Sequence, residues 1–456
     1  AVKDDEAQLA KEALDEAFEV EIQYKKIKPV EIEDNVAIVA LVGDRMKSHH
    51  GLSGKMFSAL GNNNINIRAI AQGSSERNIS AVISKKDVKK ALNTLHEQFF
   101  EVPSKELNLF ITGVGNVGSK LLNQLKKQEK FLLEKLRLKV RVHGLSNSRK
   151  MLFDENGIDL ENWEKALEKG EKADKAEFFK KVDEFNLRNS IFVDNTASPD
   201  ISAWYKEYLA NSVSVVTCNK IACADSFENY QELQNLAREY GASFLYETNV
   251  GAGLPIIDTL KNLVASGDRV TKIQAVLSGS LNFVFNTYKA EDPFYKTVEM
   301  AMKEGYTEPD PKIDLSGVDV ARKILILARE SGYEMELEDI ESEDFLSKES
   351  LATTNNEDFF ELLKKDEPKF QEIYRSAEEK GEQLKYVAQL EDGKAVVGLQ
   401  SVDSQHPFYN LSGSDNIVLF FTERYPEQPL IVKGAGAGAE VTASGIFADV
   451  IRIGKK

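Results

Sequence analysis

Residues 107–130 restrict the possible fold of this chain more than any other segment. The apolar run Leu107–Thr112 is followed by Gly113-Val-Gly115-Asn-Val-Gly118 and then by a helical pattern that carries Leu121, Leu122 and Leu125. A glycine turn between a strand and a helix binds dinucleotides, because glycine allows the tight turn, the approach of a pyrophosphate and the close packing of helix on strand. The segment therefore predicts a dinucleotide-binding unit of the Rossmann type.

The residues that follow alternate between apolar runs and amphipathic stretches. Strand patterns lie at 138–142, 191–195, 213–217 and 243–246, and helical patterns at 160–186, 202–210 and 230–240. This alternation indicates a parallel sheet with helices on both faces. We expect a Rossmann domain over 104–250.

The C-terminal half changes its pattern at about residue 251. Long amphipathic strands and helices predict a separate α+β layer over 251–432, with an acidic helical linker at 335–385. A second glycine turn, Gly434-Ala-Gly436-Ala-Gly438, precedes a helix predicted at 446–451. We interpret residues 433–456 as a return to the cofactor that completes the Rossmann domain, with a flexible hinge as the alternative.

The N-terminal part is a smaller unit of another kind. Strands are predicted at 36–42, 65–72 and 79–83 and helices at 54–60 and 88–99. This order, β-α-β-β-α, is that of a ferredoxin-like module, which a trailing strand would complete. Residues 1–35 hold a helix and two alternating stretches, 18–22 and 27–32, and are interpreted as the remnant of a preceding module. Pro103 marks the boundary with the Rossmann domain.

Composition limits the possible partners and compartment. The chain has 456 residues, is 42% hydrophobic and carries a net charge of −16, which predicts about three domains and disfavours nucleic acid and anionic membranes as partners. It lacks an apolar run of about eighteen residues that would span a membrane. Cys218 and Cys223 have no second pair or neighbouring histidine, so we expect neither zinc nor a disulfide, and a reducing cytoplasm. Because the chain begins with Ala1 inside a helical pattern, we expect a piece of a longer protein.

The segment from Gly305 to Lys323 combines several acids with a lysine. The acids are Glu308, Asp310, Asp314 and Asp319. Pro309 and Pro311 predict no helix before Leu315, whereas the apolar spacing predicts one from about Gly317. Asp319 and Lys323 would then lie one turn apart, where a carboxylate can orient an ammonium. A solvated ion pair is the alternative, and the glycine turn upstream favours a functional site.

Several motifs are similar to those of homoserine dehydrogenases and extend this likeness from 107 to 456. They are Gly113–Gly118, Asp194-Asn-Thr-Ala-Ser198, Thr217-Cys-Asn-Lys220, the stretches 247–255 and 305–323, Gly436-Ala-Gly438 with Thr442-Ala443, and Ser278-Gly-Ser280, where the family usually has threonine last. Residues 36–103 resemble an ACT module, close in sequence to the last one of aspartate kinases at 42–46, 54–57, 62–70 and 72–79. The chain looks like the carboxy-terminal part of a bifunctional aspartokinase–homoserine dehydrogenase, and we expect no kinase activity from it.

The resemblance implies an oxidoreductase that interconverts L-homoserine and L-aspartate 4-semialdehyde with NAD(P)H, within threonine and methionine biosynthesis. Hydride transfer to an aldehyde builds negative charge on oxygen, which an ammonium can stabilise and protonate. Lys323 is the predicted proton donor and Lys220 the second catalytic lysine. Glu308 and Asp319 match the family's acids that bind the substrate ammonium. Asp314 is a candidate behind them, whereas Asp310 is expected only to form a turn or cap.

The predicted cofactor residues follow from the glycine motif and from the resemblance. They are Gly113, Gly115, Asn116, Val117, Gly118, Arg149, Thr196, Ser198, Lys220, Gly305, Gly436 and Gly438. The second strand is followed by Gly144-Leu-Ser-Asn-Ser-Arg-Lys150, which has no carboxylate to hold a ribose 2′-hydroxyl. Arg149 and Lys150 would accommodate a 2′-phosphate, so we expect NADP over NAD. The alternative is that Arg149 starts the next helix in solvent and NAD serves equally.

The resemblance also implies a metal, an effector and an oligomer. The loop 247–254 resembles one that holds a monovalent cation, with Glu247, Val250, Ala252 and Leu254 as sodium ligands mostly through carbonyls; a tight loop without an ion is the alternative. Threonine would bind where two ACT modules pair, with Gln72 as its polar contact, and the family suggests a homodimer or homotetramer. A non-catalytic amino-acid sensor is the rival function. An acylating semialdehyde dehydrogenase is disfavoured because neither cysteine has an obvious base.

Overall fold

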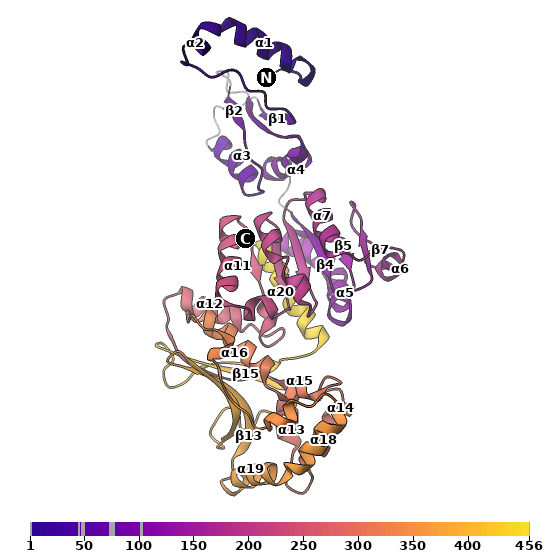
Figure 1. Cartoon of the computed structure of the whole chain (residues 1–456), viewed down its shortest axis with the longest axis vertical. Helices are drawn as coiled ribbons and strands as arrows, with labels where there is room; N and C mark the ends of the chain where they lie inside the picture. The colour runs from indigo at the N-terminus through magenta and orange to yellow at the C-terminus, as the bar shows by residue number, and fades with distance from the viewer. Residues whose placement is uncertain (1, 44–45, 47–50, 73–77, 101–103, 456) are drawn as a thin grey trace. The chain divides into compact units, whose positions relative to one another are not determined.

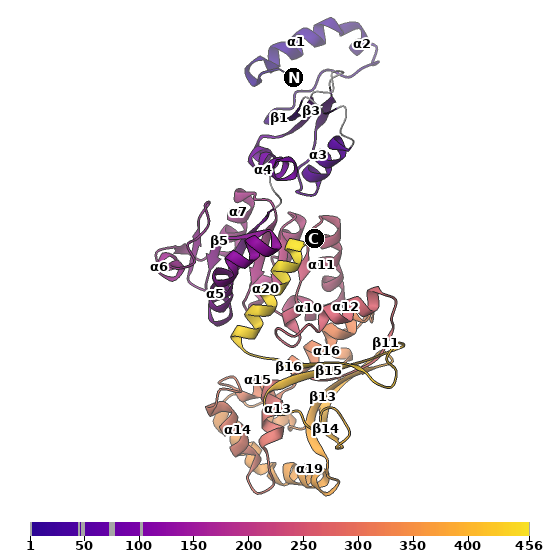
Figure 2. The same ribbon diagram turned by 180° about the vertical axis from the view of Figure 1, so that it is seen from behind.

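The computed structural model describes residues 2–43, 46, 51–72, 78–100 and 104–455 (Figures 1 and 2). The predicted boundary at Pro103 and parts of the ACT-like stretches 42–46 and 72–79 lie outside these residues. The chain divides into two compact units, Ala1–Ser104 with Asn186–Arg188 and Lys105–Phe185 with Asn189–Lys456. In the part of the chain that is described, no helix is long and apolar enough to cross a membrane.

The first unit is built on a three-stranded antiparallel sheet. Its strands are β1 (Val36–Val42), β2 (Ala69–Gln72) and β3 (Asn78–Ser84) in the order β1-β3-β2, and its helices are α3 (Leu52–Gly61), η3 (Lys85–Asp87) and α4 (Val88–Phe99). The predicted β-α-β-β-α order is confirmed, although β2 begins later than predicted. Ile65 precedes it as a buried core residue after Asn64, which has a left-handed φ of 57°.

The N-terminal residues form η1 (Asp4–Glu6), α1 (Ala7–Ala17) and α2 (Glu19–Gln23). The strand suggested by the alternation at 18–22 is therefore wrong, because these residues are helical. Residues 18–21 are exposed, Ile22 is half-buried and none of the five lies in a core, so no partner strand or core favours the alternating pattern. No strand forms at 27–32 either.

The second unit begins with a seven-stranded sheet in the order β10-β9-β8-β4-β5-β6-β7. Its strands are β4 (Lys105–Thr112), β5 (Leu138–Ser146), β6 (Lys150–Phe153), β7 (Glu171–Lys172), β8 (Ser190–Asp194), β9 (Ser214–Thr217) and β10 (Phe244–Leu245). The predicted parallel pairing is confirmed from β5 to β10, whereas β6 and β7 add an antiparallel edge that was not predicted. Strand β4 lies between β5, which follows it in the chain, and β8, which comes later, so the strand order reverses at β4. That reversal places a ligand crevice at the carboxyl ends of β4 and β8.

Helices cover this sheet and connect its strands. They are α5 (Asn116–Phe131), the π-helical turn η4 (Leu132–Leu136), α6 (Trp163–Glu168), α7 (Lys175–Phe185), α8 (Pro199–Ser202), α9 (Tyr205–Ala210), α10 (Ile221–Ala224), α11 (Phe227–Glu239), η5 (Glu247–Asn249) and α12 (Ile257–Ala265). The predicted helical stretch at 160–186 is two helices, α6 and α7. They are separated by β7 and by Gly170, which packs directly against the backbone of β6. A Cβ on this glycine would lie 2.2 Å from the Met151 carbonyl oxygen.

The C-terminal helix α20 (Ala439–Lys455) lies beside α5 in both views (Figures 1 and 2). Its apolar residues Ala443, Ile446 and Val450 are buried in the core beneath the first sheet. The helix is much longer than the predicted 446–451. Gly445 lets it approach the chain closely, since a Cβ there would lie 2.4 Å from Thr248 Cγ2.

The second sheet has six strands in the order β12-β14-β13-β11-β15-β16. The strands are β11 (Val270–Val276), β12 (Glu341–Glu343), β13 (Gln383–Glu391), β14 (Lys394–Val402), β15 (Asp415–Thr422) and β16 (Leu430–Ala435). The helices are α13 (Gly279–Thr287), α14 (Phe294–Lys303), α15 (Pro311–Leu315), α16 (Val318–Glu330), η6 (Leu337–Asp339), α17 (Lys348–Leu351), α18 (Asn356–Lys365) and α19 (Glu367–Glu379). The predicted α+β layer and its helical linker are confirmed.

Candidate active site

The glycine turn between β4 and α5 has the geometry of a phosphate cradle. Gly113 has a φ of 87°, and a Cβ on it would lie 2.8 Å from Thr196 Cγ2. Gly118 packs the helix on the strand so closely that a Cβ would lie 2.2 Å from the Gly113 carbonyl oxygen. At Gly115 nothing lies within 4 Å of a Cβ, so space is open in front of the N-terminus of α5. An anion fits this position.

Replacing Gly118 with alanine is expected to damage both the fold and cofactor binding. The added methyl collides with a backbone atom, so α5 must move off β4 at a cost of about 1–3 kcal/mol. We expect a lower Tm by circular dichroism and at least a roughly tenfold weaker NADPH affinity by fluorescence titration. Gly61→Ala is the control, because nothing lies within 4 Å of a Cβ there. Equal Tm and affinity in the two variants would contradict the packing argument.

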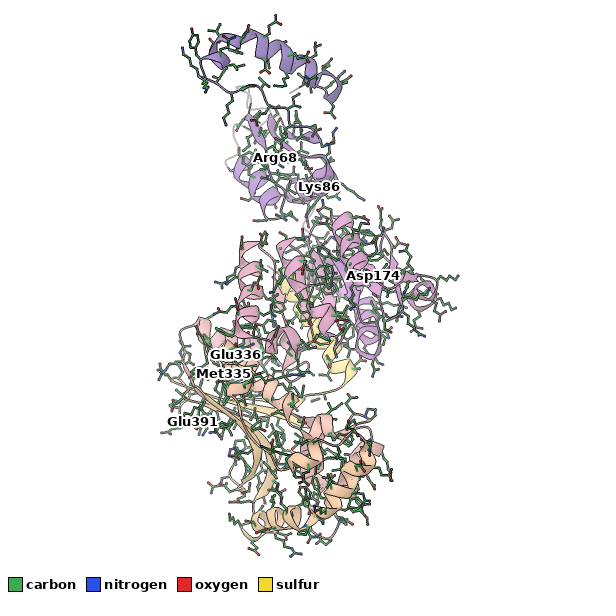
Figure 3. All side chains as sticks on the ribbon, in the orientation of Figure 1. Arg68, Lys86, Asp174, Met335, Glu336 and Glu391 are labelled. Carbon is green, nitrogen blue, oxygen red and sulfur yellow. The ribbon has the colours of Figure 1, made fainter. Side chains whose placement is uncertain are left out.

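A cavity of about 620 Å³ extends from the turn along the carboxyl edge of the sheet. Its lining includes Gly113, Ser146, Asn147, Ser148, Asp174, Lys175, Thr196 and Ser198. Figure 3 labels Asp174, whose carboxylate accepts a hydrogen bond from the Glu177 N–H at 2.9 Å and so caps α7. Arg149 is exposed next to this lining, in the hairpin before β6. The alternative that Arg149 starts a helix is wrong, and the Lys150 ammonium is occupied by the Gly170 carbonyl at 2.8 Å.

One carboxylate brings the two predicted catalytic lysines together. Asp319 Oδ2 lies 2.7 Å from Lys323 Nζ, and its Oδ1 lies 3.3 Å from Lys220 Nζ. Lys323 also donates to the Leu277 carbonyl at 2.6 Å, and its side chain is only 10% exposed. Lys220 follows β9 and Asp319 lies in the first turn of α16, so residues far apart in the sequence meet at one point.

Charge and burial oppose each other within this cluster. Burial would raise the pKa of Asp319, but the ammonium groups of Lys323 and Lys220 outweigh it and hold the pKa well below its ordinary value. Burial lowers the pKa of Lys323, and Asp319 counters part of that shift. A buried lysine with a lowered pKa can exchange a proton more readily than one in solvent.

The loop before α16 contains the other predicted acids. Asp314 accepts from the Ser280 hydroxyl at 2.7 Å and from the Glu308 N–H at 2.8 Å, so it braces this loop. The Glu308 side chain is exposed. The prediction of no helix before Leu315 is wrong: α15 begins at Pro311, because a proline is tolerated in the first helical turn and Asp310 caps it through the Lys312 N–H at 3.1 Å.

Two buried groups fix the element that carries Lys220. Asn219 donates to the Ser198 carbonyl at 2.9 Å and to Asp194 Oδ2 at 3.1 Å. Arg329, on the same helix as Lys323, donates to the Cys223 and Asp225 carbonyls at 2.9 and 2.7 Å. It also reaches the Met335 carbonyl and Glu336, two residues labelled in Figure 3. Arg329 therefore links α16, which carries Lys323, to the segment that follows Lys220.

Asn416 connects the second glycine turn to the lysine cluster. A Cβ on Gly436 would lie 2.0 Å from Asn416 Cγ, so only glycine fits. Asn416 donates to the Leu277 carbonyl at 3.3 Å, the same oxygen that accepts from Lys323. Gly438 has a φ of 118° and leads into α20, whereas Gly305, with a φ of 76°, ends α14 in the loop towards Glu308.

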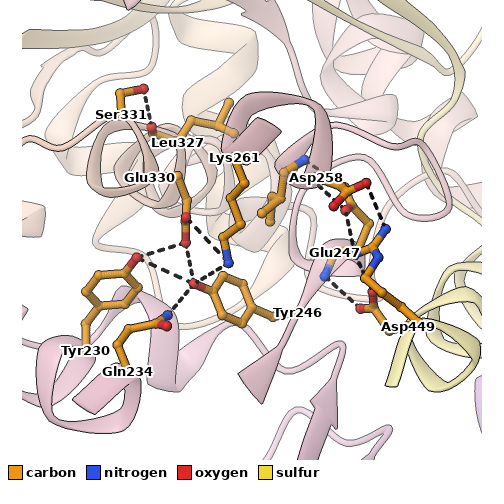
Figure 4. A network of polar contacts seen from close by, with 12 residues as sticks. Tyr230, Gln234, Tyr246, Glu247, Asp258, Lys261, Leu327, Glu330, Ser331 and Asp449 are labelled. Carbon is orange, nitrogen blue, oxygen red and sulfur yellow. Dashed lines mark hydrogen bonds and ion pairs between the residues drawn. The ribbon is translucent and has the colours of Figure 1, made fainter. Parts of the chain in front are cut away.

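Figure 4 shows the polar network around the predicted cation loop. The Glu247 carboxylate accepts from the backbone N–H groups of Ile257 and Asp258 at 2.7 and 2.8 Å, so it caps α12. Asp449 accepts from the Glu247 N–H at 3.0 Å, and burial raises the pKa of Asp449 to about 7. The carbonyl oxygens of Val250 and Ala252 accept no hydrogen bond from any described residue, while that of Leu254 accepts from the Ile256 N–H at 2.9 Å.

Several residues near the site were not predicted from the sequence. Lys175 lines the cavity at the start of α7, where its ammonium pairs with Asp200, and Arg329 and Asp194 act at a distance through hydrogen bonds. Only Asp194 had a signal, since it stands in a motif shared with the family. The thiol of Cys218 is a poor nucleophile, because burial raises its pKa to about 12.

Comparisons with known proteins agree with this geometry. The sequence matches the homoserine dehydrogenase family over residues 255–451, the family's NAD-binding domain over 113–247, and an ACT domain over 39–99. A bifunctional aspartokinase/homoserine dehydrogenase of Arabidopsis thaliana is 41% identical across 99% of this chain and 50% of its own length. A homoserine dehydrogenase of Schizosaccharomyces pombe is 36% identical across 76% of this chain and 95% of its own length.

A solved structure of a hyperthermophilic archaeal homoserine dehydrogenase in complex with NADPH superimposes with a TM-score of 0.60. It is 25% identical and covers 76% of this chain and 98% of that one. The chain spans about half the length of the bifunctional relatives that it matches. On the likeness to the yeast enzyme, which covers nearly all of that protein, the chain belongs to the homoserine dehydrogenase family.

Proposed function

We propose that this chain interconverts L-homoserine and L-aspartate 4-semialdehyde with NAD(P)H. The observation that carries the proposal is the contact of Asp319 with both Lys323 and Lys220, at 2.7 and 3.3 Å. Lys220 follows β9, and the parallel strands β9, β8 and β4 end at the same edge of the sheet as the glycine turn. A paired ammonium at that edge suits a reaction that develops charge on oxygen.

The nucleotide site supports NADP as the preferred cofactor. Open space at Gly115 and the N-terminus of α5 suit a pyrophosphate, with Asn116, Val117, Thr196 and Ser198 close to it. Arg149 is the exposed cation that would meet a 2′-phosphate, since the ammonium of Lys175 pairs with Asp200, and no carboxylate follows β5 directly. When bound, the nicotinamide supplies or accepts the hydride.

The chain's own residues handle the proton and the substrate charges. Lys323 donates a proton to the carbonyl oxygen as the aldehyde is reduced, and takes it back in the reverse direction. Its hydrogen bond to the Leu277 carbonyl fixes the direction of its ammonium, and Asp319 keeps that group charged. Glu308 and Asp319 bind the substrate ammonium, and Asp314 holds the backbone of Glu308 in place.

The direct experiment is NADP⁺ reduction with L-homoserine, followed at the absorbance of NADPH. Turnover by the purified chain is the expected result. An absence of turnover, together with threonine binding in calorimetry, would replace this proposal with a non-catalytic amino-acid sensor. Glycerol and L-serine are control alcohols that lack parts of the substrate.

Replacing Glu308 with glutamine is expected to raise the KM for L-homoserine about tenfold or more, because one carboxylate facing the substrate ammonium is lost. The kcat should change less than the KM, since the proton donor is intact. Glu304→Gln is the matched control, since Glu304 is also exposed and lies at the end of α14. Equal KM values in the two variants would remove Glu308 from the substrate site.

Four further features belong to the same proposal. Sodium binds at the loop 247–254 through the carbonyl oxygens of Val250 and Ala252, while the Glu247 carboxylate remains bonded to the first N–H groups of α12.

Threonine is the effector of the ACT domain, with the exposed Gln72 as a contact. Ile38 and Val42, 59% and 70% exposed on β1, give that domain an apolar face suited to pairing in a homodimer or homotetramer. The two free cysteines are consistent with a reducing cytoplasm.

A further inference from the structure

The Asp194 carboxylate is a buried charge that the proposed chemistry does not use. The residue is 0% exposed at the carboxyl end of β8, and burial raises its pKa. Three donors surround it: the Thr196 N–H at 2.7 Å, the Tyr205 hydroxyl at 2.6 Å and the Asn219 amide at 3.1 Å. A buried carboxylate costs several kcal/mol unless such donors compensate for it.

Two of these donors belong to different loops, which follow the neighbouring parallel strands β8 and β9. Thr196 lies in the loop after β8, where its Cγ2 would touch a Cβ on Gly113 of the phosphate turn. Asn219 directly precedes Lys220 and also accepts from the Ile221 N–H at 3.1 Å, the first residue of α10. Tyr205 differs from both, because it comes from α9 behind the sheet and its other hydroxyl contact is Thr217 at 2.8 Å.

We propose that Asp194 is a positioning residue that holds the cofactor-side loop at Thr196 and the catalytic Lys220 in one fixed arrangement through its hydrogen bonds to both loops. A neutral or apolar residue could fill the same space. A carboxylate accepts from one loop through Oδ1 and from the other through Oδ2, whereas an amide would place an NH₂ donor at one of these two positions. Small misplacements of a catalytic group cost about 100-fold in rate.

The test compares three variants in the full chain. Asp194→Asn is expected to lower kcat for L-homoserine oxidation about 100-fold and to weaken NADPH binding about tenfold, because an NH₂ group replaces one of the two oxygens and the loops no longer share an acceptor. Asn219→Ala should lower kcat to a similar extent but weaken NADPH binding less than Asp194→Asn does, since it releases Lys220 and the Ser198 carbonyl but leaves Thr196 bonded to Asp194. Tyr205→Phe removes a donor from the same carboxylate and a contact to Thr217 Oγ1, but that oxygen still accepts from the Asn219 N–H at 2.8 Å and both loops keep their bonds to Asp194. This variant should lower the Tm while kcat and NADPH affinity stay within about threefold.

The outcomes separate positioning from stability. If all three variants lose Tm and keep wild-type kcat and NADPH affinity, Asp194 is a structural residue and the proposal fails. If Asp194→Asn does not fold, the comparison of Asn219→Ala with Tyr205→Phe decides alone, and equal kcat values overturn the proposal. The inference rests on the proposed function: wild-type protein that does not oxidise homoserine refutes that function, whereas active wild type with equally active variants refutes only the role of Asp194.

Discussion

Lys323→Ala is expected to reduce kcat for homoserine oxidation by about 10³-fold while NADPH affinity stays near wild type. The reason is that Lys323 is the only cation that both contacts Asp319 at 2.7 Å and is aimed by the Leu277 carbonyl at 2.6 Å, among the described residues. General acid–base groups contribute about 10²–10⁴-fold to such reactions. Steady-state kinetics with L-homoserine and NADP⁺, with NADPH titration by fluorescence, measure the two quantities.

The control for this variant is Arg322→Ala. Arg322 is the preceding residue on α16 and also carries a positive charge, but it is exposed. Its removal should change kcat by less than about threefold, as expected for a solvated surface charge. Wild-type kcat in Lys323→Ala would eliminate Lys323 as the proton donor and return attention to Lys220.

Asp319→Asn should lower kcat/KM by about 100-fold and change the pH dependence of aldehyde reduction. With the carboxylate gone, the ammonium groups of Lys220 and Lys323 lose their shared counter-charge. In the wild type, burial lowers the pKa of Lys323 and the Asp319 carboxylate counters part of this shift. Loss of the carboxylate therefore lowers the pKa of Lys323 further. Aldehyde reduction needs protonated Lys323, and the rate should therefore begin to fall at a lower pH than in the wild type.

A pH profile of kcat/KM for the semialdehyde checks the direction of this shift. Asp310→Asn is the matched control, because Asp310 lies in the loop just before α15, where it only caps that helix and pairs with Lys312 at 3.0 Å. Its profile should superimpose on that of the wild type. An alkaline limb that stays in place, or moves to higher pH, in Asp319→Asn would contradict the electrostatic role given to Asp319.

Sequence patterns located the parts of the site that depend on local spacing. The glycine turn could be predicted because its neighbours are a strand and a helix, and the Asp319–Lys323 pair because four residues make one helical turn. The contact between Asp319 and Lys220 could not be derived from spacing, since it depends on how α16 meets the end of β9. Resemblance to the family suggested it instead.

Other features escaped prediction for identifiable physical reasons. The antiparallel edge of β6 and β7 depends on Gly170 passing beneath Met151, which a Lys/Glu-rich helical pattern conceals. The stretch 18–22 alternates like a strand but has no partner strand, so helical propensity decides its conformation. The hydrogen bonds of Asp194 and Arg329 join segments far apart in the chain, so no periodic pattern in the sequence predicts them.

The central claim is that Lys323 faces the reacting oxygen of a substrate beside the nicotinamide. A crystal structure of the chain with NADP⁺ and L-homoserine tests it most directly. We expect Lys323 Nζ within about 3 Å of the homoserine hydroxyl, with the substrate ammonium at Glu308 and Asp319. A substrate bound with its hydroxyl remote from Lys323, and its ammonium away from both carboxylates, would show that Lys323 is not the proton donor.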